Sequence, residues 1–249
     1  MRLLHITDTH LHADPGGELR GVNTFQSLQS VLGTALADPY RPELIVATGD
    51  ISQDETAGAY ENFRRILAPC GLPTLCVPGN HDAPGRMSEP LDEAPIQLGG
   101  VAVRPPWCLI MLDSYVSGDH GGALSPAVLS QLRDSLREHR ELHTLIAVHH
   151  HPLPVGSRWL DELGLRNVSA LFDVLDDAPN VRAVLSGHVH QAADLQRGDV
   201  RYLSTPSTCF QFMPNRERFA IDTRPPGFRW VDLQNSGAID TEVVWVPQP

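Results

Sequence analysis

Five apolar stretches of this chain are each followed at once by aspartate, asparagine or histidine. In one of them the run Val181–Ser186 precedes Gly187, and His188 and His190 come next. An apolar run of this length bounded by glycine is typical of a buried strand, so the polar side chains lie where the strand ends. The same arrangement recurs upstream at Asp8-Thr9-His10, Gly49-Asp50, Gly79-Asn80-His81-Asp82 and Val148-His149-His150-His151-Pro152. The chain must therefore fold so that the strands are buried while their ends carry these side chains.

The amino-terminal third alternates between strand and helix patterns. Strands are predicted at residues 3–7, 44–48 and 75–77, with helices from Asn23 or Thr24 to about residue 37 and from Asp54 to about residue 67. A polar, glycine-rich loop is predicted at residues 13–21. This β-α-β-α-β order is typical of a parallel sheet whose functional loops lie at the carboxyl ends of its strands.

The remaining chain continues with strands and two further helices. One helix is predicted from Ser125-Pro126 to about His139 and another from Asn167 to about Leu175. Short strands after His190 predict an antiparallel tail. The predicted strands are 101–103, 108–112, 144–148, 181–186, 193–196, 201–204, 219–221, 228–233 and 242–246. At 249 residues, without repeats or an evident linker, the chain is predicted to form one domain, 1–249.

Charge and cysteine content limit the classes of partner. The net charge is −11 and the chain contains no lysine, which argues against a basic groove for nucleic acid. A small anionic substrate stays compatible with this charge, because bound metal ions supply local positive charge. The cysteines are predicted to be buried free thiols, with a disulfide as the alternative, and the apolar start is too short for a signal peptide or a membrane span. A cytoplasmic protein is predicted. The four cysteines are Cys70, Cys76, Cys108 and Cys209.

The five strand ends offer carboxylate, amide and imidazole groups and no thiolate. These are hard or borderline ligands that suit divalent metal ions. Asp50 is the candidate bridge, since each carboxylate oxygen can bind a separate ion. Two ions about 3.5 to 4 Å apart lower the pKa of a shared water and hold both the attacking and the leaving oxygen at phosphorus.

The motifs Asp8-x-His10, Gly49-Asp50, Gly79-Asn80-His81-Asp82, His149-His150-x-Pro152 and Gly187-His188-x-His190 resemble, in order and spacing, those of the calcineurin-like metallophosphoesterases. The chain is most similar to the bacterial class III 3',5'-cyclic AMP phosphodiesterases. That similarity extends into residues 21–24, 151–154, 159–161, 165–167 and 205–209. The resemblance implies a four-layer α/β/β/α sandwich with mixed sheets and a dinuclear metal site at the strand ends.

The same resemblance implies a role for each motif residue. Asp8, His10, Asp50 and His190 are expected to hold one ion, and Asp50, Asn80, His149 and His188 the other. Asn80 and His81 are the expected catalytic residues, holding the phosphate while a metal-bridging hydroxide attacks phosphorus. The implied reaction is hydrolysis of 3',5'-cyclic AMP to 5'-AMP with Fe, Mn, Zn or Co as cofactors. Another small diester, such as a glycerophosphodiester or a 2',3'-cyclic nucleotide, is the alternative, ahead of a nuclease or a non-catalytic scaffold.

Several other polar and aromatic residues have competing interpretations. His150 and His151 either support the site or pack within a loop, and His151 stands where the family often has proline. Asp82 is predicted to support a neighbouring loop, and Asp54 to cap a helix. Structural roles are predicted for the isolated histidines and for Asp113-Ser114. Trp159, Phe210, Phe212 and Met213 either wall a nucleobase site, pack in the core or form a dimer contact. The isolated histidines are His5, His12, His120, His139 and His143.

The predicted partner is a small cyclic nucleotide, and binding to nucleic acid or to a membrane is not expected. A homodimer is kept as an open alternative to a monomer.

Overall fold

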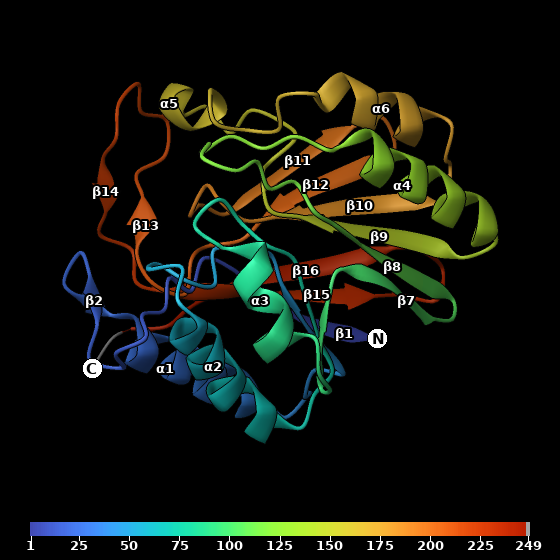
Figure 1. The fold of residues 1–249 in the computed structure, drawn as a ribbon. Helices are drawn as coiled ribbons and strands as arrows, with labels where there is room; N and C mark the ends of the chain where they lie inside the picture. Colours follow the sequence, from blue (N-terminus) through green and yellow to red (C-terminus); the bar gives the residue numbers. More distant parts are fainter. Residues whose placement is uncertain (248–249) are drawn as a thin grey trace.

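The computed structural model describes residues 1–247, so the last two residues of the predicted domain, 248 and 249, lie outside the described part. Two six-stranded sheets lie face to face (Figure 1). In spatial order the first sheet contains β16 (Ile239–Trp245), β15 (Gly227–Leu233), β1 (Arg2–Ile6), β4 (Leu44–Ala47), β5 (Thr74–Cys76) and β6 (Ile96–Leu98). The second contains β11 (Ala193–Arg197), β12 (Val200–Ser204), β10 (Val181–Ser186), β9 (His143–Val148), β8 (Trp107–Leu112) and β7 (Gly100–Arg104).

Helices cover the outer face of each sheet, as Figure 1 shows. The first sheet is covered by α1 (Thr24–Leu36), α2 (Ala57–Leu67), which continues into a 3-10 turn at Ala68–Cys70, and α3 (Pro84–Leu91). The second is covered by α4 (Pro126–Glu138) and α6 (Val168–Asp176). Smaller elements are the helix α5 (Arg158–Asp161) and the hairpins β2 (Glu18–Leu19) with β3 (Val22–Asn23) and β13 (Gln211–Phe212) with β14 (Ile221–Asp222). The predicted four-layer α/β/β/α sandwich is confirmed.

Strand alternation divides the apolar residues into three cores that match these layers. On β1, Leu4 and Ile6 pack against the helices of the first sheet, whereas Leu3 faces the second sheet. Successive side chains of a strand point to opposite faces, so one strand contributes to two cores. Trp107 on β8, which is 1% exposed, joins Leu3 in the core between the sheets. Both sheets are thus buried on two sides along their inner strands, which explains the continuous apolar runs in the sequence.

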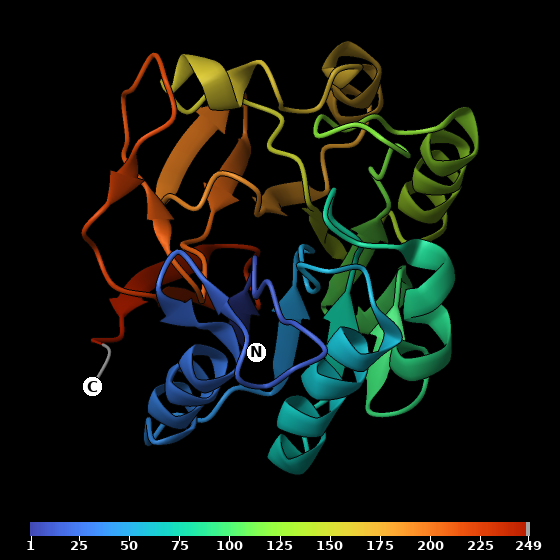
Figure 2. The ribbon, with the colours of Figure 1, turned by 60° about the vertical axis from the view of Figure 1, so that its left-hand side comes forward.

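The parallel strands place their carboxyl ends at one end of the sandwich. β1, β4, β5 and β6 are parallel to one another in the first sheet, and β8, β9, β10 and β12 in the second. Figure 1 shows β2, α5, β13 and β14 gathered at the left of the molecule, and Figure 2 shows both small hairpins on that same side. Two hairpins far apart in the sequence therefore flank the loops that follow the strands.

The carboxyl-terminal strands are only partly as predicted. β11, β15 and β16 are antiparallel to their neighbours, which confirms the predicted antiparallel tail for these strands. The prediction is wrong for β12, which lies parallel to β10. β11 runs back along the sheet edge, so the next strand returns in the direction of β10 and takes the place between them.

Other differences concern short elements and helix ends. The helix expected from Asp54 begins at Ala57 with Thr56 as its N-cap, because Asp54 instead accepts hydrogen bonds from Thr56 and from the Ala13 N–H. The loop predicted at residues 13–21 contains strand β2. Asn23 caps α1 and Ser125 caps α4, as predicted.

The cysteines are unpaired, and Cys76, Cys108 and Cys209 are buried while Cys70 is half-buried, in agreement with the prediction of free thiols. Within residues 1–247 no helix combines the length and the apolar character that a membrane crossing requires.

Candidate metal centre

The carboxyl ends of five strands bring the predicted ligands together. Three strands belong to the first sheet and two to the second, so the cluster lies where the two sheets meet. All of the predicted ligands except Asn80 are buried. They are Asp8 and His10 after β1, Asp50 after β4, Asn80 after β5, His149 after β9, and His188 and His190 after β10.

Backbone strain is concentrated in these loops. Among residues 1–247, eight residues other than glycine have a positive φ, and five of them are predicted ligands. Such conformations cost about 1–3 kcal/mol each and persist only where the surroundings enforce them, which is typical of functional sites. The five are Asp8 (52°), His10 (46°), Asp50 (49°), His188 (68°) and His190 (46°).

Two glycines allow these loops to approach each other. A Cβ atom at Gly79 would lie 2.2 Å from Asp50 Oδ1, and one at Gly187 would lie 2.0 Å from Thr7 Oγ1. Both distances are far below van der Waals contact, so a larger residue would push the loops apart. The Gly-Asn-His and Gly-His-x-His motifs therefore need glycine for close packing of the cluster.

One group of ligand atoms is formed by Asp8, His10 and His190. Nε2 of His190 lies 3.1 Å from Nε2 of His10 and 3.4 Å from Oδ1 of Asp8. Nδ1 of His190 donates a hydrogen bond to the Phe210 carbonyl at 2.7 Å, which leaves the lone pair on Nε2. Asp50 joins this group through Oδ2, which is 3.8 Å from His10 Nε2.

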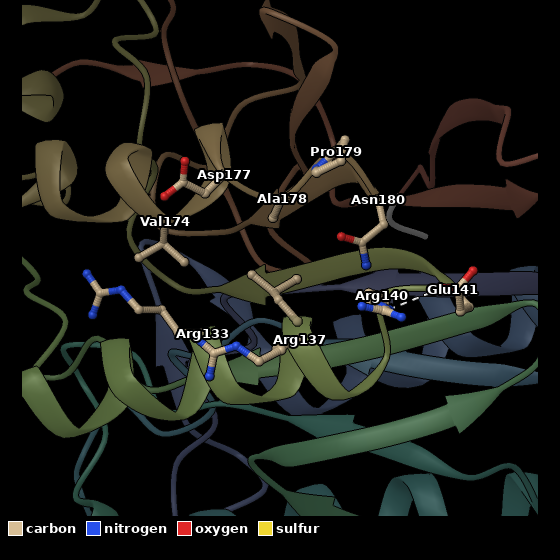
Figure 3. Close-up of a pocket in the computed structure, with 10 residues that line it drawn as sticks. Arg133, Arg137, Arg140, Glu141, Val174, Asp177, Ala178, Pro179 and Asn180 are labelled. Atoms are coloured by element: carbon tan, nitrogen blue, oxygen red, sulfur yellow. Dashed lines mark hydrogen bonds and ion pairs between the residues drawn. The ribbon is translucent and has the colours of Figure 1, made fainter.

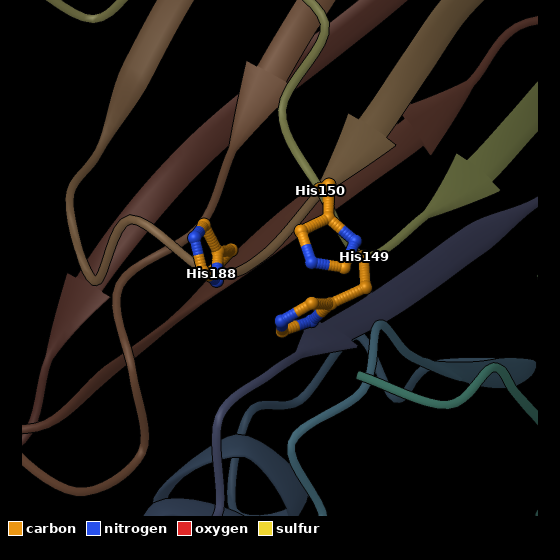
Figure 4. Close-up of side chains that lie close together, drawn as sticks. All are labelled: His149, His150 and His188. Carbon is orange, nitrogen blue, oxygen red and sulfur yellow. The ribbon is translucent and has the colours of Figure 1, made fainter. Parts of the chain in front are cut away.

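A second group of ligand atoms lies on the other side of Asp50. Oδ1 of Asp50 is 3.4 Å from Nε2 of His149, which is itself 3.1 Å from Oδ1 of Asn80. Nδ1 of His149 donates to the Thr48 carbonyl at 2.6 Å, which directs its Nε2 to Asp50 and Asn80. Figure 4 shows the ring of His188 beside that of His149, and their centroids are 5.1 Å apart. Asp50 thus presents one carboxylate oxygen to each group.

An unsatisfied nitrogen of these groups fits a metal ion. Nε2 of His188 is buried, and within residues 1–247 it has no hydrogen-bond partner. The Nε2 atoms of His10 and His190 face each other at the separation expected for two nitrogens that each lie about 2.0–2.1 Å from one ion. Buried polar atoms without partners are costly unless a ligand satisfies them. The oxygen and imidazole donors are therefore suited to a dinuclear metal site.

For Asp8, Asp50, His10 and His188 the pKa values favour the forms that bind metals. Burial acts to lower the pKa of His149, but the charges of Asp50 and Asp8 outweigh it and this pKa is raised. Burial acts to raise the pKa of both Asp8 and Asp50. His190 beside Asp8 and His149 beside Asp50 outweigh the effect of burial, so the pKa of each carboxyl group is lowered. Burial lowers the pKa of His10 to about 3. Burial and the adjacent histidines also lower the pKa of His188. At neutral pH these carboxylates are ionised and these two imidazoles are neutral, as metal ligands must be.

Asp82 supports the loops and does not face the ligand atoms. Its carboxylate accepts hydrogen bonds from the backbone N–H groups of Gly79, Ile51 and Ser52. Burial and the charge of Asp50 raise the pKa of Asp82 to about 7. The predicted role of Asp82 as a support for a neighbouring loop is confirmed.

The second and third histidines of the His149-His150-His151 run have different surroundings. Nδ1 of His150 is 2.8 Å from Ser114 Oγ, and its Nε2 is 3.2 Å from the His120 carbonyl. Both ring nitrogens of His150 thus contact the loop that follows β8. His151 is buried, and its ring stacks on His188 at 5.8 Å.

A pocket of about 420 Å³ opens onto the cluster. His81 lines it with its ring edge against His10 at 5.1 Å, while the His81 backbone N–H donates to Asp50 Oδ1 at 2.8 Å. The pocket residues that are not predicted ligands are mostly apolar or aromatic. They are Leu19, Arg20, Gln53, His81, His120, Trp159, Leu160, Leu163, Phe210, Phe212 and Phe219.

Several of these residues, among them His120, Arg20 and Phe219, were not identified as site candidates from the sequence. His120 has no partner motif and was expected to have only a structural role, yet it lines the pocket with Nδ1 3.4 Å from Asn80 Nδ2. Arg20 and Phe219 lie in hairpin loops that no motif marks. The one sequence feature that could have indicated His120 was the strand end at Asp113-Ser114, because the loop that contains His120 begins there.

The other predicted structural residues lie outside the pocket. His5 is buried between Thr48 and Thr205, and His139 follows the end of α4. Another hollow, between α4 and the segment after α6, has arginines of α4 on its wall and none of the predicted site residues (Figure 3). Arg137 pairs with Asp134 at 3.2 Å, and the hollow lacks the carboxylate and imidazole donor set of the strand ends.

Comparisons with known proteins point to one family. The family model described as calcineurin-like phosphoesterase matches residues 1–192. The 3',5'-cyclic adenosine monophosphate phosphodiesterase CpdA of Escherichia coli K12 is 43% identical over 244 residues, which cover 98% of this chain and 89% of that protein. The CpdA protein of Pseudomonas aeruginosa is 39% identical, with coverage of 97% and 88%. A 3',5'-cyclic-nucleotide phosphodiesterase of Nostoc sp. PCC 7120 is 38% identical, with coverage of 98% and 92%.

A solved structure agrees with the fold. A dimetal phosphatase from Danio rerio superposes with a TM-score of 0.69 over 99% of this chain and 98% of that one. The sequence identity is 16%, so this likeness concerns the arrangement of the sheets and helices.

Proposed function

The chain belongs to the calcineurin-like phosphoesterase family, and we propose that it hydrolyses 3',5'-cyclic AMP to 5'-AMP. It is a metal-dependent phosphoesterase related to cyclic nucleotide phosphodiesterases. The observation that carries the proposal is the pocket, which joins the Asp/His cluster to an aromatic wall. A phosphodiester suits the cluster and a flat base suits the wall. Unpaired thiols support a location in the reducing cytoplasm.

We assign the ligands by the two groups of donor atoms. Asp8, His10, Asp50 and His190 hold one ion, and Asp50, Asn80, His149 and His188 hold the other. This division is supported by the two oxygens of Asp50, each of which faces a different group. Fe, Mn, Zn and Co all suit imidazole and carboxylate donors. When bound, such ions activate a water molecule and neutralise charge on the phosphate.

The chain's own residues orient the phosphate and supply hydrogen-bond donors. Oδ1 of Asn80 is turned to His149, so its Nδ2 is on the side of His120 in the pocket and can donate to a phosphate oxygen. His81 is held by its backbone bond to Asp50, and its ring lies beside His10. In the proposed reaction water attacks phosphorus and the bond from phosphorus to the 3' oxygen breaks. His81 places its ring N–H where it donates to the phosphate or gives a proton to the leaving oxygen.

A panel of phosphodiesters tests the proposal. Metal-loaded protein is assayed with 3',5'-cyclic AMP, 2',3'-cyclic AMP, a glycerophosphodiester and a single-stranded oligonucleotide. We expect kcat/KM for 3',5'-cyclic AMP to exceed the others by about tenfold or more, which corresponds to about 1.4 kcal/mol. Equal or reversed ratios would remove the assignment to cyclic AMP and favour the diester that reacts fastest.

A His81→Asn variant is the matched test of mechanism. It removes the imidazole while keeping a hydrogen-bonding side chain. We expect kcat to fall by about 10²- to 10⁴-fold, as for the loss of a general acid, with the metal content unchanged. Wild-type kcat in this variant would contradict the role of His81.

A further inference from the structure

A series of aromatic rings leads from the metal centre to the mouth of the pocket. The ring of Phe212 stacks on His190 with centroids 4.4 Å apart and an interplanar angle of 28°. Trp159 and Phe219 then meet Phe212 edge to face at 4.9 and 5.5 Å, and each other at 5.4 Å. Phe219 is 48% exposed, although all of these rings line the pocket. The far end of the wall is therefore an apolar face that is open to a ligand.

Arg20 lines the same pocket and lies over the exposed ring of Phe219 at this end. Its guanidinium carbon lies 5.4 Å from the centroid of the Phe219 ring, within the range of a cation–π contact. Apart from this cation–π contact, the Arg20 side chain makes no hydrogen bond or ion pair with residues 1–247. Of the described residues that line the pocket, Arg20 is the only arginine. Its position is notable in a chain with a net charge of −11.

The backbone of Arg20 is strained. Arg20 has φ of 53° and is followed by Gly21 with φ of 80°, so the β2–β3 turn uses two left-handed residues. Asparagine or glycine occupies the first of these positions at lower energy than arginine. The arginine therefore occupies a position where turn stability alone favours another residue. A strained residue at the rim of a pocket is a pointer to function.

We propose that Arg20 and Phe219 form a clamp for the nucleobase of the substrate, an inference that rests on the proposed function of the pocket. The base stacks on the aromatic wall, and the planar guanidinium of Arg20 covers the base from the other side. The guanidinium must move outward from its present 5.4 Å over Phe219 to admit the base, and no hydrogen bond or ion pair among residues 1–247 holds it in place. Guanidinium groups stack on flat π systems, and base–aromatic stacking does not require a particular base. The clamp therefore selects nucleotides over diesters without a base, and it distinguishes little between adenine and guanine.

The position of the clamp favours the base over the phosphate as its ligand. Phe219 is linked to His190 through Phe212, so the clamp lies at the end of the wall away from the metal ligands. The two residues come from separate hairpins that Figure 2 shows on the same side of the molecule. A flat group that enters between the hairpins meets both residues while its phosphate reaches the Asp/His cluster.

The first experiment removes the exposed ring. Phe219→Ala is compared with Tyr40→Ala, which removes an exposed aromatic side chain outside the pocket. Both are assayed with 3',5'-cyclic AMP and with methyl riboside 3',5'-cyclic phosphate, which has the same reacting phosphate and no base. We expect Phe219→Ala to raise KM for cyclic AMP about tenfold and to change KM for the riboside less than about twofold. Tyr40→Ala should resemble the wild type with both.

The second experiment separates stacking from charge. Arg20→Lys keeps the charge without the planar group, Arg20→Leu removes both, and Arg104→Leu is the control on the exposed edge strand β7. We expect Arg20→Lys and Arg20→Leu to raise KM for cyclic AMP by similar factors, with the riboside little changed. Arg104→Leu should leave both values unchanged. Protein fluorescence adds a readout without turnover, because Trp159 lines the pocket: 5'-AMP should quench it and ribose 5-phosphate should not.

Three results would overturn the clamp. KM values that rise equally for both substrates would show that the residues act on the phosphate. A loss in Arg20→Leu that Arg20→Lys restores would show that charge alone matters. A change in oligomeric mass of Phe219→Ala with unchanged KM values would assign the exposed ring to a contact between subunits. A wild type that hydrolyses neither cyclic phosphate would instead refute the proposed function.

Discussion

The adjacent residues His149 and His150 have different hydrogen-bond partners and different proposed roles. His149 directs Nε2 to Asp50 and Asn80, whereas both nitrogens of His150 contact the loop between Ser114 and His120. Gly122 fits against His150, since a Cβ atom there would lie 2.2 Å from its Nδ1. The two rings are in contact, with centroids 4.8 Å apart, and both lie near His188, so only the partners of their nitrogens distinguish them and sequence spacing alone leaves the ligand ambiguous. The distinction is testable by replacing one residue at a time.

His149→Ala is expected to reduce the bound metal from about two ions to about one per chain and to lower kcat strongly, since an ion of the two-metal site is lost. His150→Ala should keep both ions and lose about 1–3 kcal/mol of unfolding free energy, because the partners of a buried hydrogen-bonding group are left unsatisfied. Elemental analysis and urea unfolding measure the two quantities. Loss of metal in His150→Ala with full metal in His149→Ala would reverse the assignment.

His5 provides a prediction about pH at the residue scale. Burial, together with the charge of Arg229, lowers the pKa of His5 to about 3, although Asp8 acts to raise it. The unfolded chain has a histidine pKa of about 6.5, so below that pH it binds a proton that the folded chain excludes. Stability from neutral His5 is therefore complete above about pH 6.5 and is lost as the pH falls towards 3. At pH 5 the loss is about 2 kcal/mol.

Between pH 7 and pH 5, we expect the unfolding free energy of His5→Gln to fall by about 2 kcal/mol less than that of the wild type. Glutamine keeps a hydrogen-bonding group between Thr48 and Thr205 without a titrating proton. Urea unfolding at several pH values measures the slope, with His139→Gln as the matched substitution outside the core. An identical slope in His5→Gln and wild type would show that His5 does not contribute to acid sensitivity.

At the scale of elements, helix α4 depends on its first turn. Ser125 accepts a hydrogen bond from the Val128 N–H at 3.2 Å, and Pro126 occupies the first helical position. Ser125→Ala should lower the unfolding free energy by about 1 kcal/mol, because one orphan N–H loses its partner. Ser130→Ala, an exposed position within the same helix, should change it little or raise it slightly, since alanine favours helix. Thermal or urea unfolding compares the two, and equal effects would contradict the capping role.

The long periodic elements and the strand ends were predictable, whereas the short elements were not. Residues that follow buried runs, such as Asp50 and His188, meet because carboxyl ends of parallel strands share one edge. The packing of two sheets face to face was predicted only from the resemblance to calcineurin-like metallophosphoesterases, because no local sequence pattern indicates it. Helix α3 has Pro90 within it and spans eight residues, so neither length nor periodicity marks it. Strand β12 was assigned the wrong direction because its pairing depends on where β11 lies.

The pocket wall was the least predictable part of the site. Its aromatic residues come from α5 and from the hairpin β13–β14, which pack by tertiary contacts between distant segments. Phe219 sits in a loop with no periodic pattern, and Arg20 in a turn that sequence preferences assign to other residues. Motif spacing identifies side chains that share a strand end, but a wall assembled from separate loops needs the fold.

At the scale of the whole molecule, the proposed metal ligands come from both sheets. Asp8, Asp50 and Asn80 extend from the first sheet, and His149 and His190 from the second. Ions that bind these ligands together bind the folded chain and not the unfolded one, so they stabilise the sandwich by mass action. Metal at about one hundred times its dissociation constant adds about 2.7 kcal/mol, which for a chain of this size raises Tm by about 5–10 °C.

Chelation followed by dialysis should therefore lower Tm by about 5–10 °C, and added Mn²⁺ should restore it. Asp50→Asn is the informative variant, because the carboxylate that faces both groups of donors is replaced by a neutral side chain of the same shape. We expect its Tm to respond much less to Mn²⁺ than that of the wild type. Scanning calorimetry with and without metal measures both. An equal response in the variant would mean that the ions bind elsewhere, because a site that spans both sheets cannot keep its affinity without the shared carboxylate.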